Sequence, residues 1–255
     1  MMSLSNLQFL SPDSLCYSFD HRANGYSRGE GFGVIVLKPL SQALANNDTI
    51  RAVIRASSSN KDGRTPGITQ PSGDAQELLI QETYEKAGLD LGATRFFEAH
   101  GTGTQIGDTT EAAAIHSVFG KYRSPEEPLI VGAVKSNVGH LEGASGLASI
   151  IKAVLALEKG VIPPNTNFEK PNPRIPVKEW NIKVSSTRSS ARDVTNQCPV
   201  SDRKYSMAFK RSSKSVCQLV WLRWGQCTCH LRRRTSLSES PRTSRSPPNS
   251  DTKRS

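Results

Sequence analysis

The stretch Phe96–Gly146 decides how this chain is organised, and it reads FFEAHGTGTQIGDTTEAAAIHSVFGKYRSPEEPLIVGAVKSNVGHLEGASG. It holds two glycine-rich turns, and each turn follows a short apolar run and precedes a helical pattern. The first turn opens with His100, and the second carries Lys135 and His140. Neighbouring strand–turn–helix units place their turns at one edge of an α/β sheet, so the sequence predicts that these three side chains meet there.

Apolar runs and helical patterns alternate along the rest of the chain. Strands are expected at 34–37, 50–57, 95–99, 129–134 and 180–184, and helices at 39–46, at 74–87, from 108 onward and at 147–158. This order predicts an α/β fold in which helices cover a mostly parallel or mixed sheet.

Local signals set the expected helix ends and faces. Gly88 is expected to end the helix at 74–87 as a C-cap. Asp108 and Glu111 have the spacing of a capping box, which predicts that a helix begins at Asp108. In the helix at 147–158, apolar residues at helical spacing predict the buried stripe, namely Leu147, Ile150, Ile151, Val154 and Leu155.

Charge divides the chain into two parts. The formal net charge is +10, but residues 186–255 hold 15 Lys/Arg and only 4 Asp/Glu, so the preceding residues are close to neutral. The segment 186–255 also has 15 serines and one glycine, and it lacks sustained periodicity. Low hydrophobicity with high net charge predicts a disordered basic tail. Because the basic charge lies in this tail, the body is not expected to bind nucleic acid.

The sequence contains no signal for a membrane or for secretion. No apolar run approaches the roughly 18 residues that a membrane-spanning helix needs. Of the five cysteines, only Cys16 precedes the tail, so a disulfide framework is not expected. These features together favour a cytoplasmic protein.

His100, Lys135 and His140 form a set that suits enolate chemistry. Two neutral imidazoles can each donate an N–H to one carbonyl oxygen and stabilise the negative charge that develops there. The lysine adds positive charge and an orienting donor. Gly101 and Gly103 allow the tight turn that leaves room for a slender substrate arm. Decarboxylation of a malonyl-type thioester is one reaction that fits.

Other interpretations of these motifs are possible. A lone histidine at a strand end is often a satisfied structural residue. The turn Gly101-x-Gly103-x-x-x-Gly107 follows a strand, as a nucleotide-binding loop does, but its spacing is one residue too long. The cluster Cys227-x-Cys229-His230 lacks a second ligand pair at a suitable spacing, so no metal site is predicted.

Two longer motifs resemble the signatures of a known family. Glu98–Thr104 (EAHGTGT) and Lys135–Glu142 (KSNVGHLE) resemble the C-terminal motifs of the β-ketoacyl synthase (ketosynthase) domain of type I polyketide synthases. The flanking segments agree, among them 25–31, 60–63, 67–71 and 162–165, so the resemblance runs from about residue 9 to residue 184. The sequence of these motifs is most similar to that of fungal highly reducing polyketide synthases.

The resemblance implies a thiolase-like fold, with two similar α/β halves, of which this chain carries the C-terminal one, and a homodimer. It also implies a decarboxylative Claisen condensation between an acyl thioester and malonyl on an acyl carrier protein. No cofactor is expected to bind the chain directly, since phosphopantetheine belongs to the carrier protein. The implied catalytic residues are His100, His140 and Lys135, and the implied substrate-channel or turn residues are Gly101, Thr102, Gly103, Thr104, Asn137 and Gly139.

The departures from the family concern its nucleophile and the tail. The family's active-site cysteine lies in an Asp-Thr-Ala-Cys turn, which is absent here, and Cys16 matches a position downstream of it. The chain alone is therefore expected not to condense acyl groups. We divide it into a remnant of the preceding half (1–12), a C-terminal ketosynthase part (13–185) and a tail (186–255). The tail does not resemble the family, and it suggests out-of-frame or intron-derived translation.

Two further functions remain open at this point. The chain could be a non-catalytic module that docks to a carrier protein or a full synthase. The basic tail, with Arg232–Arg234, could instead bind nucleic acid or direct the protein to the nucleus.

Overall fold

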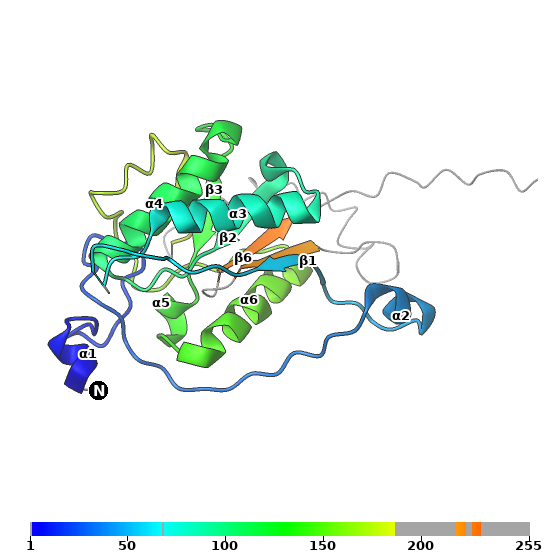
Figure 1. Ribbon diagram of the computed structural model, residues 1–255, viewed down its shortest axis with the longest axis horizontal. Coiled ribbons are helices and arrows are strands. Elements are labelled where there is room, and N and C mark those ends of the chain that lie inside the picture. Colours follow the sequence, from blue (N-terminus) through cyan, green and yellow to red (C-terminus); the bar gives the residue numbers. More distant parts are fainter. Residues whose placement is uncertain (1, 68, 187–217, 223–225, 231–255) are drawn as a thin grey trace, which may run out of the picture.

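The protein is an α/β structure in which helices lie on both faces of one mixed sheet (Figure 1). The structure is a computed structural model, and it describes residues 2–67, 69–186, 218–222 and 226–230. The sheet has the strand order β1-β5-β6-β2-β3-β4. The strands are β1 (Val53–Ser58), β2 (Thr94–Glu98), β3 (Leu129–Gly132), β4 (Ile182–Val184), β5 (Gln218–Leu222) and β6 (Gln226–His230). The α/β class predicted from the sequence is confirmed.

Strands β2, β3 and β4 are parallel, as the alternation of strands and helices predicts. β2 pairs with β3 and β3 with β4 in parallel, whereas β6 is antiparallel to both β2 and β5. The helices are α1 (Met2–Asn6), α2 (Leu40–Ala45), α3 (Gly73–Ala87), α4 (Gln105–Phe119), α5 (Lys135–Val138) and α6 (Ser145–Lys159), with short 3₁₀ turns at Leu91–Ala93, Gly120–Tyr122 and Glu142–Ala144.

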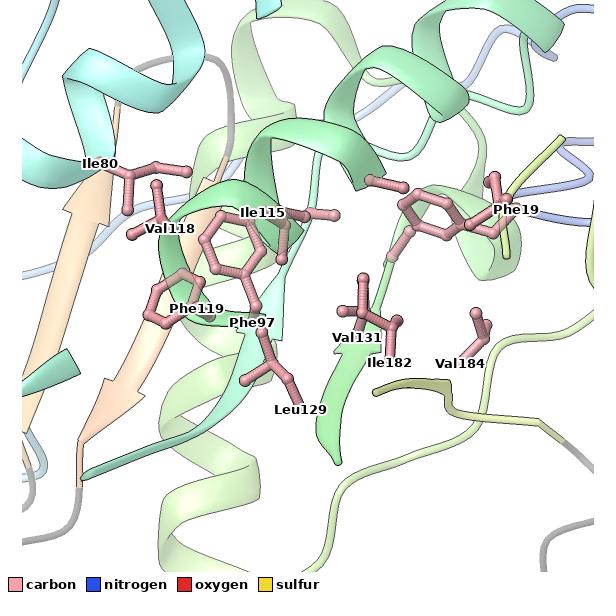
Figure 2. Packing of buried hydrophobic residues seen from close by; sticks show 14 of the residues in the cluster. Phe19, Ile80, Phe97, Ile115, Val118, Phe119, Leu129, Val131, Ile182 and Val184 are labelled. Carbon is pink, nitrogen blue, oxygen red and sulfur yellow. The ribbon is translucent and has the colours of Figure 1, made fainter. Parts of the chain in front are cut away.

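Two apolar layers hold the sheet between its helices. Successive side chains of a strand point to opposite faces, so Phe97 faces α3 and α4 while Phe96 faces α6. The first layer, shown in Figure 2, joins the sheet to α3 and α4 and includes Phe19, Ile80, Phe97, Ile115, Val118, Phe119, Leu129, Val131, Ile182 and Val184. The second layer joins it to α6 and includes Phe96, Ile130, Ile150, Ala153, Leu157 and Ile162. Both layers are needed because β2 and β3 carry apolar side chains on both faces.

The strand expected at 34–37 is not formed. This segment runs as an extended connection below α6, between the first residues and α2 (Figure 1). Val34 and Val36 are 80% and 94% exposed, whereas Ile35 packs against the layer that faces α6. The alternation of a strand is therefore present, but within the described residues no neighbouring strand pairs with it, and a strand forms only by pairing.

The predicted disorder of the tail is wrong for ten of its residues. β5 and β6 lie in the segment 186–255, and they insert between β1 and β2. Residues 218–222 read QLVWL, and Val and Trp favour strands. The prediction of disorder used the mean composition of the whole tail, which does not show this short apolar segment. Apart from Ser186, the other tail residues lie outside those that the structure describes, including Arg232–Arg234.

The buried face of α6 also differs from the predicted stripe. The helix itself is confirmed, and Ile150 is buried as expected. However, Ile151 and Leu155 are 40% and 39% exposed, while the small residues Ser149 and Ala153 face the sheet. The apolar stripe does not identify the buried face of α6, because small side chains on that face let the helix approach the sheet closely.

The C-cap predicted at Gly88 is confirmed, since Gly88 follows α3 with a φ of +58°. We expect Gly88→Ala to lower the free energy of unfolding by about 1 kcal/mol, because an L-residue is strained in this left-handed conformation. A Cβ at Gly88 would meet no atom within 4 Å, so steric clash adds nothing. Urea denaturation measures the change. Gly143→Ala is the matched control, because Gly143 also has open space but lacks the positive φ, and equal losses in both variants would contradict the prediction.

Candidate active site

The two glycine-rich turns lie side by side at the carboxyl ends of β2 and β3. These strands pair in parallel, and the N–H of Ala99 donates to the carbonyl of Gly132 at 2.7 Å, which continues the pairing into the turns. The first turn covers residues 99–104, and the second runs from Ala133 to His140. This is the place where an open α/β sheet presents its site.

The two histidines contact each other across these turns. The ring centroids of His100 and His140 are 5.4 Å apart, and the rings are nearly perpendicular, at 86°. The ring of Tyr26 lies 5.0 Å from that of His140 on a third segment. The juxtaposition of the two histidines that the sequence predicts is therefore present.

Hydrogen bonds set the tautomer of His140. Its Nδ1 accepts the backbone N–H of Glu142 at 3.0 Å, and the hydroxyl of Ser145 lies 3.2 Å from the same nitrogen. A nitrogen that accepts an N–H carries no proton, so the neutral ring holds its proton on Nε2. His140 therefore offers Nε2–H as a donor.

Burial keeps His140 neutral. It lowers the pKa of His140 to about 4, and the cation of Lys135 adds to this fall, while the carboxylate of Glu142 opposes it. Near pH 7 the ring is therefore a neutral donor rather than an acid.

Lys135 begins α5 and is 1% exposed. Burial lowers the pKa of Lys135, whereas the carboxylates of Glu111 and Glu98 oppose this change. Within the described part of the chain its Nζ makes no hydrogen bond. An amine that is buried but lies among carboxylates can still act as a local positive charge, so its position suits an orienting cation.

The capping box predicted at Asp108 and Glu111 is wrong. α4 begins three residues earlier, at Gln105 after Thr104, and both carboxylates are buried within the helix. They instead hold the first turn. Glu111 accepts the N–H groups of His100 and Gly101, both at 2.8 Å.

Asp108 also holds the first turn by accepting backbone N–H groups. Its carboxylate accepts the N–H of Phe19 at 2.6 Å and that of Gly103 at 3.0 Å. Burial raises the pKa of Asp108 to about 7, and the neighbouring Glu111 adds to the rise, although the backbone N–H groups lower it. Because Asp108 and Glu111 are three residues apart in a helix, both carboxylates lie on the face of α4 that meets the turn. The same spacing is typical of a capping box, so the sequence alone did not distinguish the two roles.

The glycines of the first turn are required by close approach. Gly101 has a φ of +45°, and a Cβ there would lie 2.4 Å from the Cβ of Ala133. Gly103 has a φ of +82°, and a Cβ there would lie 2.7 Å from the backbone nitrogen of Tyr17. A larger residue at Gly101 would separate the two turns, and one at Gly103 would clash with the segment that holds Tyr17.

The other predicted turn residues fall into two groups. Thr102 is buried, and its hydroxyl lies 3.1 Å from that of Thr104. Gly139 ends α5 with a φ of +76° and packs against Ser27 and Arg28. Asn137, in contrast, is exposed, and its side chain accepts a hydrogen bond from Ser136. Thr102 and Gly139 are therefore buried and Thr104 is partly buried, whereas Asn137 lies at the surface.

Cys16 is the only cysteine whose side chain the structure describes. It is 1% exposed, and its Sγ accepts the N–H of Ser27 at 3.2 Å. The thiol is therefore buried and already accepts one hydrogen bond. Among the described residues, no three His, Cys, Asp or Glu side chains are grouped so that they could hold a metal ion. None of the described helices is long and apolar enough to cross a membrane.

Comparisons with known proteins identify the family of this chain. The family "Beta-ketoacyl synthase, C-terminal domain" matches residues 51–169, and the family "Beta-ketoacyl synthase, N-terminal domain" matches residues 1–43. The chain is 61% identical over 183 residues to highly reducing polyketide synthase 40 of Fusarium mangiferae. It is 64% identical over 174 residues to a highly reducing polyketide synthase of Pyricularia oryzae. These matches cover 72% and 68% of this chain but only 7% and 6% of the two relatives.

Solved structures give the same family. The ketosynthase from module 6 of the bacillaene synthase of Bacillus subtilis 168 superposes with a TM-score of 0.71 at 31% identity, over 90% of this chain and 38% of that chain. An oxazolomycin ketosynthase domain from Streptomyces albus superposes with a TM-score of 0.72 at 27% identity, over 94% of this chain and 40% of that chain. The thiolase-like fold predicted from the motifs is confirmed, and the chain spans about two fifths of these solved ketosynthases. Its motifs, its fold and its relatives together show that this chain belongs to the β-ketoacyl synthase family and is part of a ketosynthase of the polyketide synthase type.

Proposed function

We propose that this chain carries the enolate-stabilising part of a ketosynthase centre, which acts on a malonyl-type thioester. The observation that carries the proposal is the hydrogen bond from the Glu142 N–H to Nδ1 of His140, since it leaves Nε2–H as the donor beside the ring of His100. A neutral N–H donor of fixed direction is what a developing oxyanion requires.

The reaction follows from this arrangement. The bond between the α-carbon and the carboxylate of the malonyl group breaks, and carbon dioxide leaves. The electron pair of that bond forms an enolate, and the negative charge gathers on the thioester oxygen, where His140 Nε2–H donates to it. The cation of Lys135 lowers the energy of the same charge. Protonation of the enolate at carbon by water gives an acetyl thioester and hydroxide, whereas attack on an acyl thioester would give the condensation product and release the thiolate of that thioester.

The partner that fits is an acyl carrier protein that presents the thioester on its phosphopantetheine arm. Gly101 and Gly103 do not open a channel for this arm, because Ala133 and Tyr17 already fill the space beside them. In this proposal the protein works in the cytoplasm as part of a ketosynthase homodimer.

Condensation needs a thiolate to carry the acyl group. Cys16 does not fit this role, because it is buried and its Sγ is engaged with Ser27. We therefore propose that the chain by itself decarboxylates but does not elongate, and that the acyl-bearing cysteine is supplied by another segment.

Radiolabelled malonyl-carrier protein, incubated with the purified full chain, tests both parts of the proposal. Carbon dioxide and acetyl-carrier protein are the expected products. A β-ketoacyl product after addition of an acyl thioester would refute the statement that the chain does not elongate. Binding of the carrier protein without release of carbon dioxide would refute the enolate role and favour a docking module instead.

A further inference from the structure

A buried ion pair lies directly behind the proposed centre. Glu98, the last residue of β2, is 0% exposed, and the side chain of Lys152 on α6 is 8% exposed. The Nζ of Lys152 lies 2.6 Å from Oε2 of Glu98. Both side chains sit in the layer that joins the sheet to α6, which is otherwise apolar. Moving two charges out of water costs much of what their attraction returns, so stability alone does not account for this pair.

The pair connects the segments that carry all three side chains of the centre. Glu98 precedes His100 by two residues, and its Oε1 accepts the N–H of Val134 at 2.6 Å, next to Lys135. Lys152 belongs to α6, which begins at Ser145, and the hydroxyl of Ser145 lies 3.2 Å from His140 Nδ1. The carboxylate of Glu98 therefore links the first turn to the second through its hydrogen bond with Val134, and its ion pair with Lys152 links both turns to α6.

The space around the lysine is narrow. Its Nζ lies 5.6 Å from the ring centroid of Phe96, and a Cβ at Gly132 would approach this nitrogen to 3.1 Å. The amine is therefore confined between a glycine of β3 and an aromatic ring of β2. Such confinement fixes α6 against the ends of both strands.

We propose that Glu98 and Lys152 are positioning residues, which set the placement of His100, Lys135 and His140 relative to one another. The role in catalysis rests on the proposed function, in which these three side chains act on the thioester. The positioning itself is a property of the fold and can be measured without substrate.

The main test uses the double variant Glu98→Gln/Lys152→Met. It removes both charges together, so no unpaired charge is left in the interior, and the glutamine oxygen can still accept the N–H of Val134. Replacing a buried ion pair by neutral groups of similar volume is often tolerated. We expect the variant to fold but to lose the tie to α6. Decarboxylation should then fall in kcat by about 10- to 100-fold with KM little changed, because misplacing groups by about 1 Å can cost 10²-fold.

A substrate-free measurement separates this proposal from the proposed function. Nitrogen-15 NMR of the histidine rings reports which nitrogen of His140 carries the proton. The parent chain is expected to show Nε2–H. The double variant is expected to show a mixture of tautomers, since a shift of α6 also moves the turn Glu142–Ala144 that precedes it and weakens the contacts of Glu142 and Ser145 with Nδ1. This result would support positioning even if the chain released no carbon dioxide, an outcome that overturns the proposed function alone.

The control is Leu79→Ala, which opens a cavity in the layer on the opposite face of the sheet and lowers stability without touching the pair. Its kcat and its His140 tautomer should match the parent chain. Should the double variant fail to fold, Lys152→Arg keeps the charge but does not fit the confined space, and it should change the His140 signals in the same direction. An unchanged tautomer and an unchanged kcat in the folded variants would overturn the proposal.

Discussion

Replacing His140 by alanine is expected to slow malonyl decarboxylation by about 10²–10³-fold, which is the usual loss when one oxyanion donor is removed. The reason is geometric. The Glu142 N–H and the Ser145 hydroxyl hold Nδ1, so the Nε2–H of this ring has one direction. Alanine leaves the thioester oxygen without that donor, so that only His100 and Lys135 stabilise the enolate. The rate of carbon dioxide release at saturating malonyl-carrier protein is the quantity to measure.

His116→Ala is the matched control for this experiment. His116 lies in the last turn of α4, where its ring stacks on Trp180 at 5.0 Å and 8°. It is the same residue type at a structural position, so its loss should reduce stability but not the rate of the folded protein. If His140→Ala kept the parental rate, or if both variants lost activity equally, His140 would not be the donor.

The second large effect concerns Asp108 and pH. The pKa of Asp108 is raised from 3.8 to about 7 in the folded protein, chiefly by burial. Between these values the folded protein holds a proton that the unfolded chain has released. The contribution of Asp108 to the free energy of unfolding therefore falls as the pH rises from about 4 to 7. A shift of about three units corresponds to a loss on the order of 4 kcal/mol.

His140 contributes with the opposite sign. Its pKa is lowered from 6.5 to about 4, so between these values the unfolded chain holds the extra proton and stability rises with pH. The two contributions offset each other in the parent chain, and only variants separate them.

Urea denaturation of the parent chain and of Asp108→Asn, across this pH range, measures the Asp108 contribution. The variant will be less stable at every pH, because the amide replaces one of the two side-chain oxygens by an NH2 group, which cannot accept the backbone N–H bound there. Its deficit relative to the parent should shrink as the pH rises from 4 to 7, whereas the deficit of His140→Gln should grow. Parallel pH profiles for the parent chain and Asp108→Asn would show that Asp108 titrates normally.

Much of this protein follows from its sequence alone. The alternation of apolar runs and helical patterns predicts the α/β sheet. Apolar residues at every second position indicate a strand with one buried face, and apolar residues with a period of 3.6 indicate a helix with one buried face. The motifs EAHGTGT and KSNVGHLE predict both the family and the three side chains at the strand ends. Parallel strands bring their carboxyl ends to one edge, so the pairing of β2 and β3 brings the two turns that carry His100 and His140 together.

The tertiary structure decided what the local patterns left ambiguous. Asp108 and Glu111 have the spacing of a cap, yet they bind the first turn, because the turn folds back onto α4 and its buried N–H groups need acceptors. The segment 34–37 has the pattern of a strand but lacks a pairing partner within the described residues. The link between Glu98 and Lys152 spans more than fifty residues, and no local pattern reports it. A sequence pattern records which residues prefer burial, whereas their partners are chosen only when distant segments pack together.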